Sequence, residues 1–436
     1  MGGLAKAIEG LSEALSLAGL PATGSCSIGF EVGEDAFRLS ISDESHEVQT
    51  ASEQLSEVDF VFTLSGSSWA KYCSDPPPRG YTTAQAMCAT HNGASVRGNR
   101  TAWATYALVV DRVMAALKDL VCGHGPVKNP DPPPAGIRSP ITGGYLNTEI
   151  RGVGQRIYYE VSGKGQPVLC LHTAGADSRQ FRYLLEDHEL ITQYRFVAFD
   201  MPWHGRSDPP DDWADRDYRL DTETYSQTIL AVMGGLALQN PILVGCSMGG
   251  AIALYMAAMH GELFKGVCAL EGGLGNPGRF VPWTNHLEVD HSHFLTSWVG
   301  GLISPTSPWG PRSQTLWGYA QSGPGVYQGD TYFYSNDFPK YADLMEKSNC
   351  PLWVFSGEYD YSATTEMSRE AAKKLGGRLL VMPGAGHFPM SEDPVSFRSY
   401  FVPVLEEISA RPPAATFEVS DDDLAPVEQP PLGKSN

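Results

Sequence analysis

Residues 241–250 read Pro241-Ile242-Leu243-Val244-Gly245-Cys246-Ser247-Met248-Gly249-Gly250. The apolar run at the start predicts a buried strand, and the Ala-, Met- and Leu-rich residues 251–260 predict a helix directly after it. The pentad between them has the form G-x-S-x-G, in which the glycines permit a tight turn and leave the serine hydroxyl exposed at its tip. We therefore interpret Ser247 as a candidate nucleophile rather than as part of an ordinary Gly/Ser turn.

A serine hydroxyl is a weak nucleophile and needs a base, which in turn needs an acid to orient it. Both partners are expected later in the chain, after the carboxyl ends of further strands. His387 follows one such apolar strand in a glycine-rich loop, and we predict that it is the base. Asp360 follows the strand before it and is the predicted acid, in preference to Glu358. Glu271, directly after a third strand, is a less favoured substitute.

An attacked carbonyl develops negative charge on its oxygen, and backbone N–H groups are the usual donors to it. The N–H of Met248, at the start of the predicted helix, is one candidate donor. The other is the N–H of Ala174, in the loop that follows an earlier strand. In that loop we expect His172 to hold the backbone by hydrogen bonds rather than to act as a base.

The length of 436 residues predicts two folded units rather than one. We expect a smaller α+β domain over residues 1–122, a Pro-rich linker over 123–141, and a disordered tail over 411–436. Between linker and tail, residues 142–410 alternate short apolar strands with helical stretches. That alternation predicts an α/β domain with a mainly parallel sheet covered on both faces.

Alternating side chains in the first unit predict a meander of antiparallel strands, followed by helices and one more short strand. The four strands of the expected meander are residues 26–32, 36–41, 46–51 and 58–64.

The balance of 50 acidic against 31 basic residues gives a net charge of −19, which argues against nucleic acid and anionic membrane surfaces as partners. No run of about 18 apolar residues predicts a membrane span. The eight cysteines have no paired spacing, so we expect free thiols and a cytoplasmic location. No zinc motif is present, and we expect neither a metal nor a cofactor.

Five spaced motifs together resemble the α/β-hydrolase superfamily, and in particular its esterase, lactonase and C–C hydrolase branches. They are Leu171 to Gly175, Asp200 to Asp208, the turn at Ser247, Gly357 to Asp360, and Gly386-His387. The resemblance implies the α/β-hydrolase fold, the triad of Ser247, His387 and Asp360, and Ala174 and Met248 as oxyanion donors. Thr173 and Trp203 each replace the glycine that is usual in the family at these positions.

Between Glu271 and Lys347 the strand pattern is interrupted, and in this fold such an insertion usually forms a helical cap. We therefore expect a cap at about 272–347. Its many aromatic residues either line an apolar pocket or form the core of the cap itself. The candidate substrate-binding residues are Thr173, Trp203, Trp283, Trp298 and Trp317.

The order of elements in the first unit resembles the sterol-carrier-protein-2 domains, with Trp69 in a helix after the last meander strand and Val96 to Asn99 before the closing helix. That resemblance implies an apolar tunnel for a lipid-like chain. A solid core used for packing is the alternative.

The sequence predicts a serine hydrolase that cleaves an ester, a lactone or the C–C bond of a 1,3-dicarbonyl in a medium-sized apolar substrate. A non-hydrolytic enzyme on the same fold and a carrier of lipid-like ligands are the alternatives. Acidic two-domain hydrolases are often homodimers, but no stretch of this chain indicates its oligomeric state.

The choice of acid can be tested by substitution. Asp360→Asn should abolish most activity, because the imidazole loses the carboxylate that orients it, whereas Glu358→Gln should retain it. Steady-state kinetics of the two variants compares them. Equal losses, or a loss confined to Glu358→Gln, would reverse the assignment.

Overall fold

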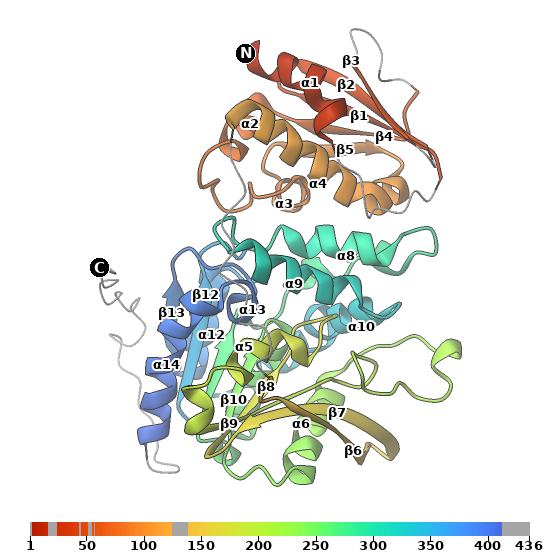
Figure 1. Cartoon of the computed structure of the whole chain (residues 1–436). Coiled ribbons are helices and arrows are strands. Elements are labelled where there is room, and N and C mark those ends of the chain that lie inside the picture. The colour runs from red at the N-terminus through yellow and green to blue at the C-terminus, as the bar shows by residue number, and fades with distance from the viewer. Residues whose placement is uncertain are drawn as a thin grey trace, which may run out of the picture. The chain divides into compact units, whose positions relative to one another are not determined.

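The structure is a computed structural model that describes residues 2–15, 24–42, 45–50, 55, 57–123 and 138–411. The chain divides into two units (Figure 1). Unit 1 comprises Met1–Pro130 and Pro282–Gln321, and unit 2 comprises Asp131–Val281 and Ser322–Asn436. Most of the predicted linker and all but the first residue of the predicted tail lie outside the described residues.

Unit 1 contains a five-stranded sheet in the order β3-β2-β1-β4-β5. Its strands are β1 (Cys26–Val32), β2 (Asp35–Ile41), β3 (His46–Thr50), β4 (Phe60–Leu64) and β5 (Ala94–Gly98). The predicted meander holds for the first three strands and is wrong for the fourth, because β4 lies parallel beside β1. Alternation shows which face of a strand is buried but not which strand it pairs with. The half-exposed β3 stays at the edge, and the buried β4 takes a central position.

Helices cover this sheet and complete the core of unit 1. They are α1 (Gly2–Ala14), α2 (Gly66–Tyr72), α3 (Ala84–Ala89) and α4 (Arg100–Cys122). The Asn99 side chain accepts hydrogen bonds from the amides of Thr101 and Ala102, which caps α4. From α4, Trp103 stacks on Phe62 of the sheet, with ring centroids 6.2 Å apart.

Part of the predicted cap also belongs to unit 1. This part, residues 282–321, contains η6 (Pro282–Asn285), α8 (His291–Gly300) and α9 (Trp309–Ala320), and α8 packs against α4. The Ser297 hydroxyl donates to the half-buried carboxylate of Asp111 at 2.6 Å, and the Thr82 hydroxyl donates to the Gly301 carbonyl at 2.8 Å. The other parts of the predicted cap, residues 272–281 and 322–347, belong to unit 2.

Unit 2 contains an eight-stranded sheet in the order β13-β12-β11-β10-β8-β9-β7-β6. Strands β8 to β13 run parallel, and β7 and β6 add antiparallel strands at one edge. The predicted mainly parallel sheet is therefore confirmed. The strands are β6 (Thr142–Ile150), β7 (Val153–Gly163), β8 (Gln166–Leu171), β9 (Tyr194–Phe199), β10 (Ile242–Cys246), β11 (Gly266–Leu270), β12 (Leu352–Gly357) and β13 (Arg378–Met382).

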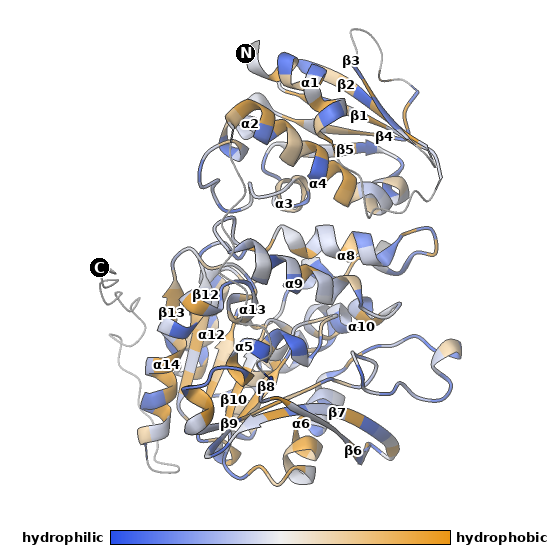
Figure 2. Ribbon diagram, in the orientation of Figure 1, coloured by the Kyte–Doolittle hydropathy of each residue, from blue (hydrophilic) through white to orange (hydrophobic). Residues whose placement is uncertain are grey.

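Helices lie on both faces of this sheet, and its central strands β8, β10 and β12 are strongly apolar (Figure 2). The helices of unit 2 are η1 (Ser178–Phe181), α5 (Arg182–Leu185), η2 (Leu190–Thr192), η3 (Trp213–Asp215), α6 (Thr222–Gly235), α7 (Met248–Met259), η4 (Gly261–Leu263), η5 (Pro277–Arg279), α10 (Val326–Tyr332), η7 (Phe333–Asp337), α11 (Pro339–Ala342), α12 (Thr365–Leu375), α13 (Pro389–Glu392) and α14 (Pro394–Ala410). Since the apolar strands are buried on both faces, their sequence shows continuous apolar runs rather than alternation.

The sequence also predicts a helix over residues 180–190, and the structure divides it into the short helical segments η1, α5 and η2. The Asp187 side chain accepts hydrogen bonds from the amides of Glu189 and Leu190, both at 3.0 Å. Such local bonds give the backbone an alternative to the helix.

The turn between β10 and α7 depends on glycines for steric reasons. A Cβ atom on Gly245 would lie 2.0 Å from the carbonyl oxygen of Gly249, and one on Gly249 would lie 2.4 Å from that of Leu171. Helix α7 can therefore pack directly on β10 and β11, with its first turn behind Ser247.

The cysteines at positions 26, 73, 88, 122, 170, 246, 268 and 350 are free thiols. Within the described part of the chain, no helix is both long and apolar enough to cross a bilayer.

Gly249→Ala should lower the free energy of unfolding by at least about 2 kcal/mol, because the new methyl group meets a backbone oxygen that cannot move away. Gly234→Ala is the matched control, since Gly234 lies in the exposed last turn of α6 with open space around it. It should stabilise the protein by about 0.5–1 kcal/mol. Denaturant unfolding of both variants measures the two changes, and a neutral Gly249→Ala would contradict the steric argument.

Candidate active site

Ser247 lies in the turn between β10 and α7, and its backbone dihedral angles are strained. Its φ of 55° and ψ of −110° fall outside the regions that residues with a side chain normally adopt. Hydrogen bonds hold this conformation: the Ser247 amide donates to the Leu270 carbonyl at 2.9 Å, and the Ala251 amide donates to the Ser247 carbonyl at 2.8 Å. In this conformation the hydroxyl is within hydrogen-bonding distance of His387.

The imidazole of His387 bridges Ser247 and Asp360. Its Nε2 lies 2.8 Å from Ser247 Oγ, and its Nδ1 lies 2.6 Å from Asp360 Oδ2. With the Asp360 oxygen as the acceptor, Nδ1 carries the hydrogen, and Nε2 is left to accept the one from the serine hydroxyl. The structure therefore brings the three predicted catalytic side chains together in the arrangement of a serine nucleophile, its base and an acid.

Asp360 and Glu358 occupy different environments in the same turn. Asp360 is fully buried, and its Oδ1 accepts from the amides of Ser362 at 2.7 Å and Ala363 at 3.2 Å. Glu358 is exposed, and its carboxylate accepts from the Gly384 amide at 2.9 Å. Of the two acids, Asp360 is the one that contacts His387.

The predicted oxyanion donors lie at the start of α7 and in the loop after β8. Ala174 is 3% exposed and Met248 is fully buried. Among the described groups, neither of these two amides has a protein acceptor. Their N–H groups are therefore available to an acceptor from outside the chain, as the predicted role requires.

Buried side chains fix the loop that carries Ala174. His172 Nδ1 donates to the Thr173 carbonyl at 2.8 Å, and its Nε2 accepts from the Met201 amide at 3.1 Å. The amide and the hydroxyl of Thr173 both donate to the side-chain oxygen of Gln180 at 3.0 Å. Thr173, a predicted substrate-binding residue, is 1% exposed and uses its hydroxyl in this internal contact.

Asp330 of α10 is a further anchor of the same loop, and the sequence did not reveal it. Its Oδ2 accepts from the Gly175 amide at 2.7 Å and from His204 Nε2 at 2.8 Å, and its Oδ1 accepts from the Tyr218 hydroxyl at 3.0 Å. The carboxyl group is completely buried. No local pattern marks Asp330, because the Gly175 amide lies 155 residues earlier in the chain.

Two buried histidines beside this loop differ in their ionisation. Burial lowers the pKa of His204, but the adjacent Asp330 carboxylate outweighs that effect and raises it above its usual value. Burial and the charge of His204 together lower the pKa of His172. His172 is therefore a neutral hydrogen-bonding residue, in agreement with the sequence prediction.

A small pocket opens beside Ser247 and His387, with about 20 Å³ accessible to water. Its walls come from the ends of β11 and β12, from α12 and from η7, and they include Glu271, Asn276, Tyr334 and Met367. Such a volume is large enough for a single water molecule.

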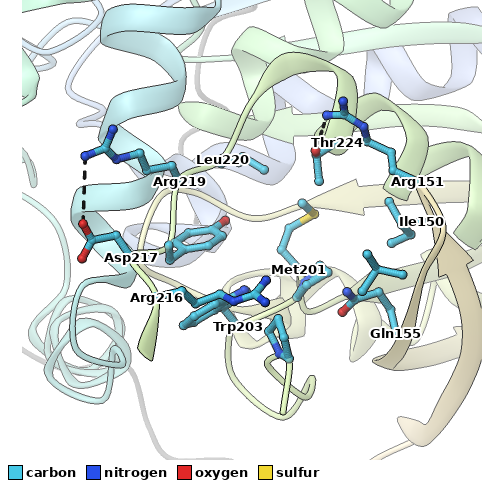
Figure 3. Close-up of a pocket in the computed structure, with 14 residues that line it drawn as sticks. Ile150, Arg151, Gln155, Met201, Trp203, Arg216, Asp217, Arg219, Leu220 and Thr224 are labelled. Atoms are coloured by element: carbon cyan, nitrogen blue, oxygen red, sulfur yellow. Dashed lines mark hydrogen bonds and ion pairs between the residues drawn. The ribbon is translucent and has the colours of Figure 1, made fainter. Parts of the chain in front are cut away.

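Trp203 lines a different pocket of about 300 Å³, whose residues do not include Ser247 (Figure 3). Its φ of 76° directs the half-buried indole against Tyr218, with ring centroids 5.2 Å apart. Met201, Ile150 and Arg151 also line this second pocket.

The three remaining predicted substrate-binding residues, Trp283, Trp298 and Trp317, belong to unit 1. Trp298 of α8 is 7% exposed and packs on Phe294, with ring centroids 5.5 Å apart. Trp317 of α9 is 62% exposed. The side chain of Trp283 lies outside the described part of the structure. The sequence left two roles open for the aromatic residues of the predicted cap, a pocket wall or the core of the cap itself. For Trp298 the structure shows a core residue.

Within the described residues, Glu271, Asp360 and His387 form a cluster whose potential metal-ligand atoms lie within 4.8 Å of one another. Both imidazole nitrogens in it are already engaged, by Asp360 and by Ser247. The cluster therefore fits a proton-transfer site better than a metal site.

Several known proteins similar to this chain are named hydrolases. The chain is 35% identical over 119 residues to the AB hydrolase superfamily protein YisY of Bacillus subtilis, covering 27% of this chain and 40% of that protein. It is 25% identical over 293 residues to human epoxide hydrolase 4, covering 60% of this chain and 79% of that protein. Among solved structures, an esterase from Thermogutta terrifontis superposes with a TM-score of 0.53 at 17% identity, over 61% of this chain and 99% of the esterase.

The model of the alpha/beta hydrolase family matches residues 168–398. This range begins in β8, ends in α14 and includes the turn at Ser247, the acid turn and the loop of His387. More than half of the chain lies within it, and the eight-stranded sheet has the topology that the resemblance implies. The chain belongs to the alpha/beta hydrolase family.

Proposed function

We propose that this protein is a serine hydrolase that acts through a covalent acyl-enzyme. The observation that carries the proposal is the continuous hydrogen-bond chain from Asp360 through His387 to Ser247. The chemistry of these groups suits attack on a carbonyl carbon, since a serine oxygen activated by a neutral imidazole is an acyl-transfer nucleophile.

In the first half-reaction Ser247 Oγ attacks the carbonyl carbon, and His387 Nε2 takes the hydroxyl proton. The tetrahedral oxyanion accepts hydrogen bonds from the amides of Ala174 and Met248. His387 then gives its proton to the leaving group, and the acyl group stays on Ser247. In the second half-reaction His387 takes a proton from water, the resulting hydroxide attacks the acyl carbon, and the acid is released as the proton returns to Ser247.

The substrate we propose is an ester, a lactone or a 1,3-dicarbonyl of medium size and apolar character. The same residues serve cleavage of C–O and C–C bonds, so the triad alone does not select between them. The human relative is named an epoxide hydrolase, and epoxides therefore belong in the substrate panel.

We also propose a cellular location for the protein and a ligand for its N-terminal unit. The eight free thiols support a reducing, cytoplasmic location. The resemblance of the N-terminal unit to sterol-carrier-protein-2 domains stays a prediction, and its consequence would be that this unit holds a lipid-like chain.

A fluorophosphonate probe should label Ser247 stoichiometrically, because the activated hydroxyl displaces fluoride from phosphorus. Ser247→Ala should abolish labelling, and His387→Gln should slow it by at least about 100-fold. Ser399→Ala, at an exposed position of α14, is the control and should label like the wild type. Intact-protein mass spectrometry measures the adduct.

A folded protein that does not label would favour the carrier of lipid-like ligands. Turnover of an epoxide that survives Ser247→Ala would also contradict the acyl-enzyme route.

Asp330→Asn should lower kcat by about 10- to 100-fold with a small change in KM, because an amide cannot accept from all three donors and the Ala174 N–H shifts. Tyr218→Phe is the matched control: it removes one donor to Asp330 but leaves the Gly175 contact in place, so its loss should be several-fold smaller. Steady-state kinetics of folded variants, checked by thermal melts, compares them. An unchanged kcat in Asp330→Asn would contradict the role of Asp330 as an anchor.

A further inference from the structure

Behind the triad lies a second carboxyl group that the proposed mechanism does not use. Glu271 follows β11 and is 1% exposed. Its φ of 48° is unusual for a residue with a side chain, and its amide donates to the Phe355 carbonyl at 2.9 Å. Its carboxyl oxygen lies within 4.8 Å of the reactive atoms of both Asp360 and His387.

The hydrogen bonds to Glu271 do not suit a charged carboxylate. The Gly357 amide donates to both of its oxygens, at 2.8 and 2.9 Å, so a single N–H group is shared between them. The buried Glu392 provides a contrast, since separate amides of Gly386 and Phe388 donate to its two oxygens at 2.7 and 3.2 Å.

The ionisable groups that face Glu271 come from four elements. They are Cys246 at the end of β10, Asp360 after β12, His387 after β13 and Glu392 of α13. Burial, followed by the charge of Asp360, raises the pKa of Glu271 well above its usual value, and Glu392 adds to the effect. An ionised Glu271 would place a second buried negative charge beside Asp360, and such a pair is unfavourable because the two charges repel each other.

We propose that Glu271 is a neutral carboxylic acid that donates its hydrogen to the Asp360 carboxylate, and that it thereby acts as a positioning residue for the triad. The inference rests on the proposed function, since it concerns the same site. Asp360 then accepts from Glu271 as well as from Ser362, Ala363 and His387. These donors fix its orientation and make it less basic, so the shared hydrogen stays on His387 Nδ1.

The pH dependence of kcat/KM tests the charge of Glu271, because the acidic limb reports the pKa of His387 in the free enzyme. Glu271→Gln keeps the shape, the neutrality and a donor to Asp360. We expect its acidic limb to coincide with that of the wild type, while kcat/KM falls by less than about tenfold because an amide is a weaker donor. If Glu271 is ionised instead, the substitution removes a negative charge beside the imidazolium. The limb then moves to lower pH by about one unit, which overturns the proposal.

Glu271→Met tests whether Glu271 acts through Asp360. It keeps the chain length but donates nothing, so Asp360 becomes more basic and stabilises the imidazolium more strongly. We expect the limb to move to higher pH by about half a unit or more. A residue that only fills space would leave the limb unmoved, and that result would contradict the positioning role. Glu358→Gln is the control, because it removes a charge at an exposed position of the turn that also carries Asp360.

A direct measurement needs neither turnover nor a variant that folds. In wild-type protein labelled with ¹³C at glutamate carboxyls, one signal should keep the chemical shift of a protonated acid at neutral pH. Its absence overturns the proposal. If the protein turns over no ester, lactone or dicarbonyl, the proposed function fails, but this signal still reports the state of Glu271.

Discussion

Two hydrogen bonds, from His387 to Asp360 and from Ser247 to His387, are the constraint on which the rest of unit 2 depends. The bonded residues are 27 and 140 positions apart in the sequence. A parallel sheet joins such distant residues, because the carboxyl ends of its strands meet at one edge. The turns after β10, β12 and β13 carry the three side chains, and the apolar strands behind them keep that edge rigid.

Buried carboxyl groups hold the loops around this chain of hydrogen bonds. Glu392 binds the amides on both sides of His387, Glu271 binds the Gly357 amide before the turn that carries Asp360, and Asp330 binds the Gly175 amide in the loop after β8. A buried polar group is costly unless it is hydrogen-bonded, and each of these side chains meets that requirement by fixing a backbone segment. The polar interior of unit 2 is therefore a scaffold for the reacting groups.

The sequence was sufficient to predict the sheet and to select Ser247, His387 and Asp360, which the structure brings together. The G-x-S-x-G turn, the acid turn and the glycine-rich histidine loop each lie beside an apolar strand, so a local pattern reveals both the residue and its place in the fold. The choice of Asp360 over Glu358 follows from the same turn, and the structure buries the first and exposes the second.

Long-range pairings could not be predicted in this way. The parallel contact of β4 with β1, the packing of α8 on α4 and the anchor at Asp330 all join segments far apart in the chain. An aromatic residue such as Trp298 has the same local pattern in a pocket wall as in a helix core, so its role depends on partners that the sequence does not specify.

The most direct test of the acyl-transfer account is a crystal structure of the protein after reaction with an apolar phosphonate ester. The account predicts a bond from Ser247 Oγ to phosphorus, with the phosphoryl oxygen about 2.7–3.1 Å from the amides of Ala174 and Met248. The hydrogen bond from His387 to Asp360 should remain. Phosphorus on another residue, or a phosphoryl oxygen that contacts neither amide, would contradict it.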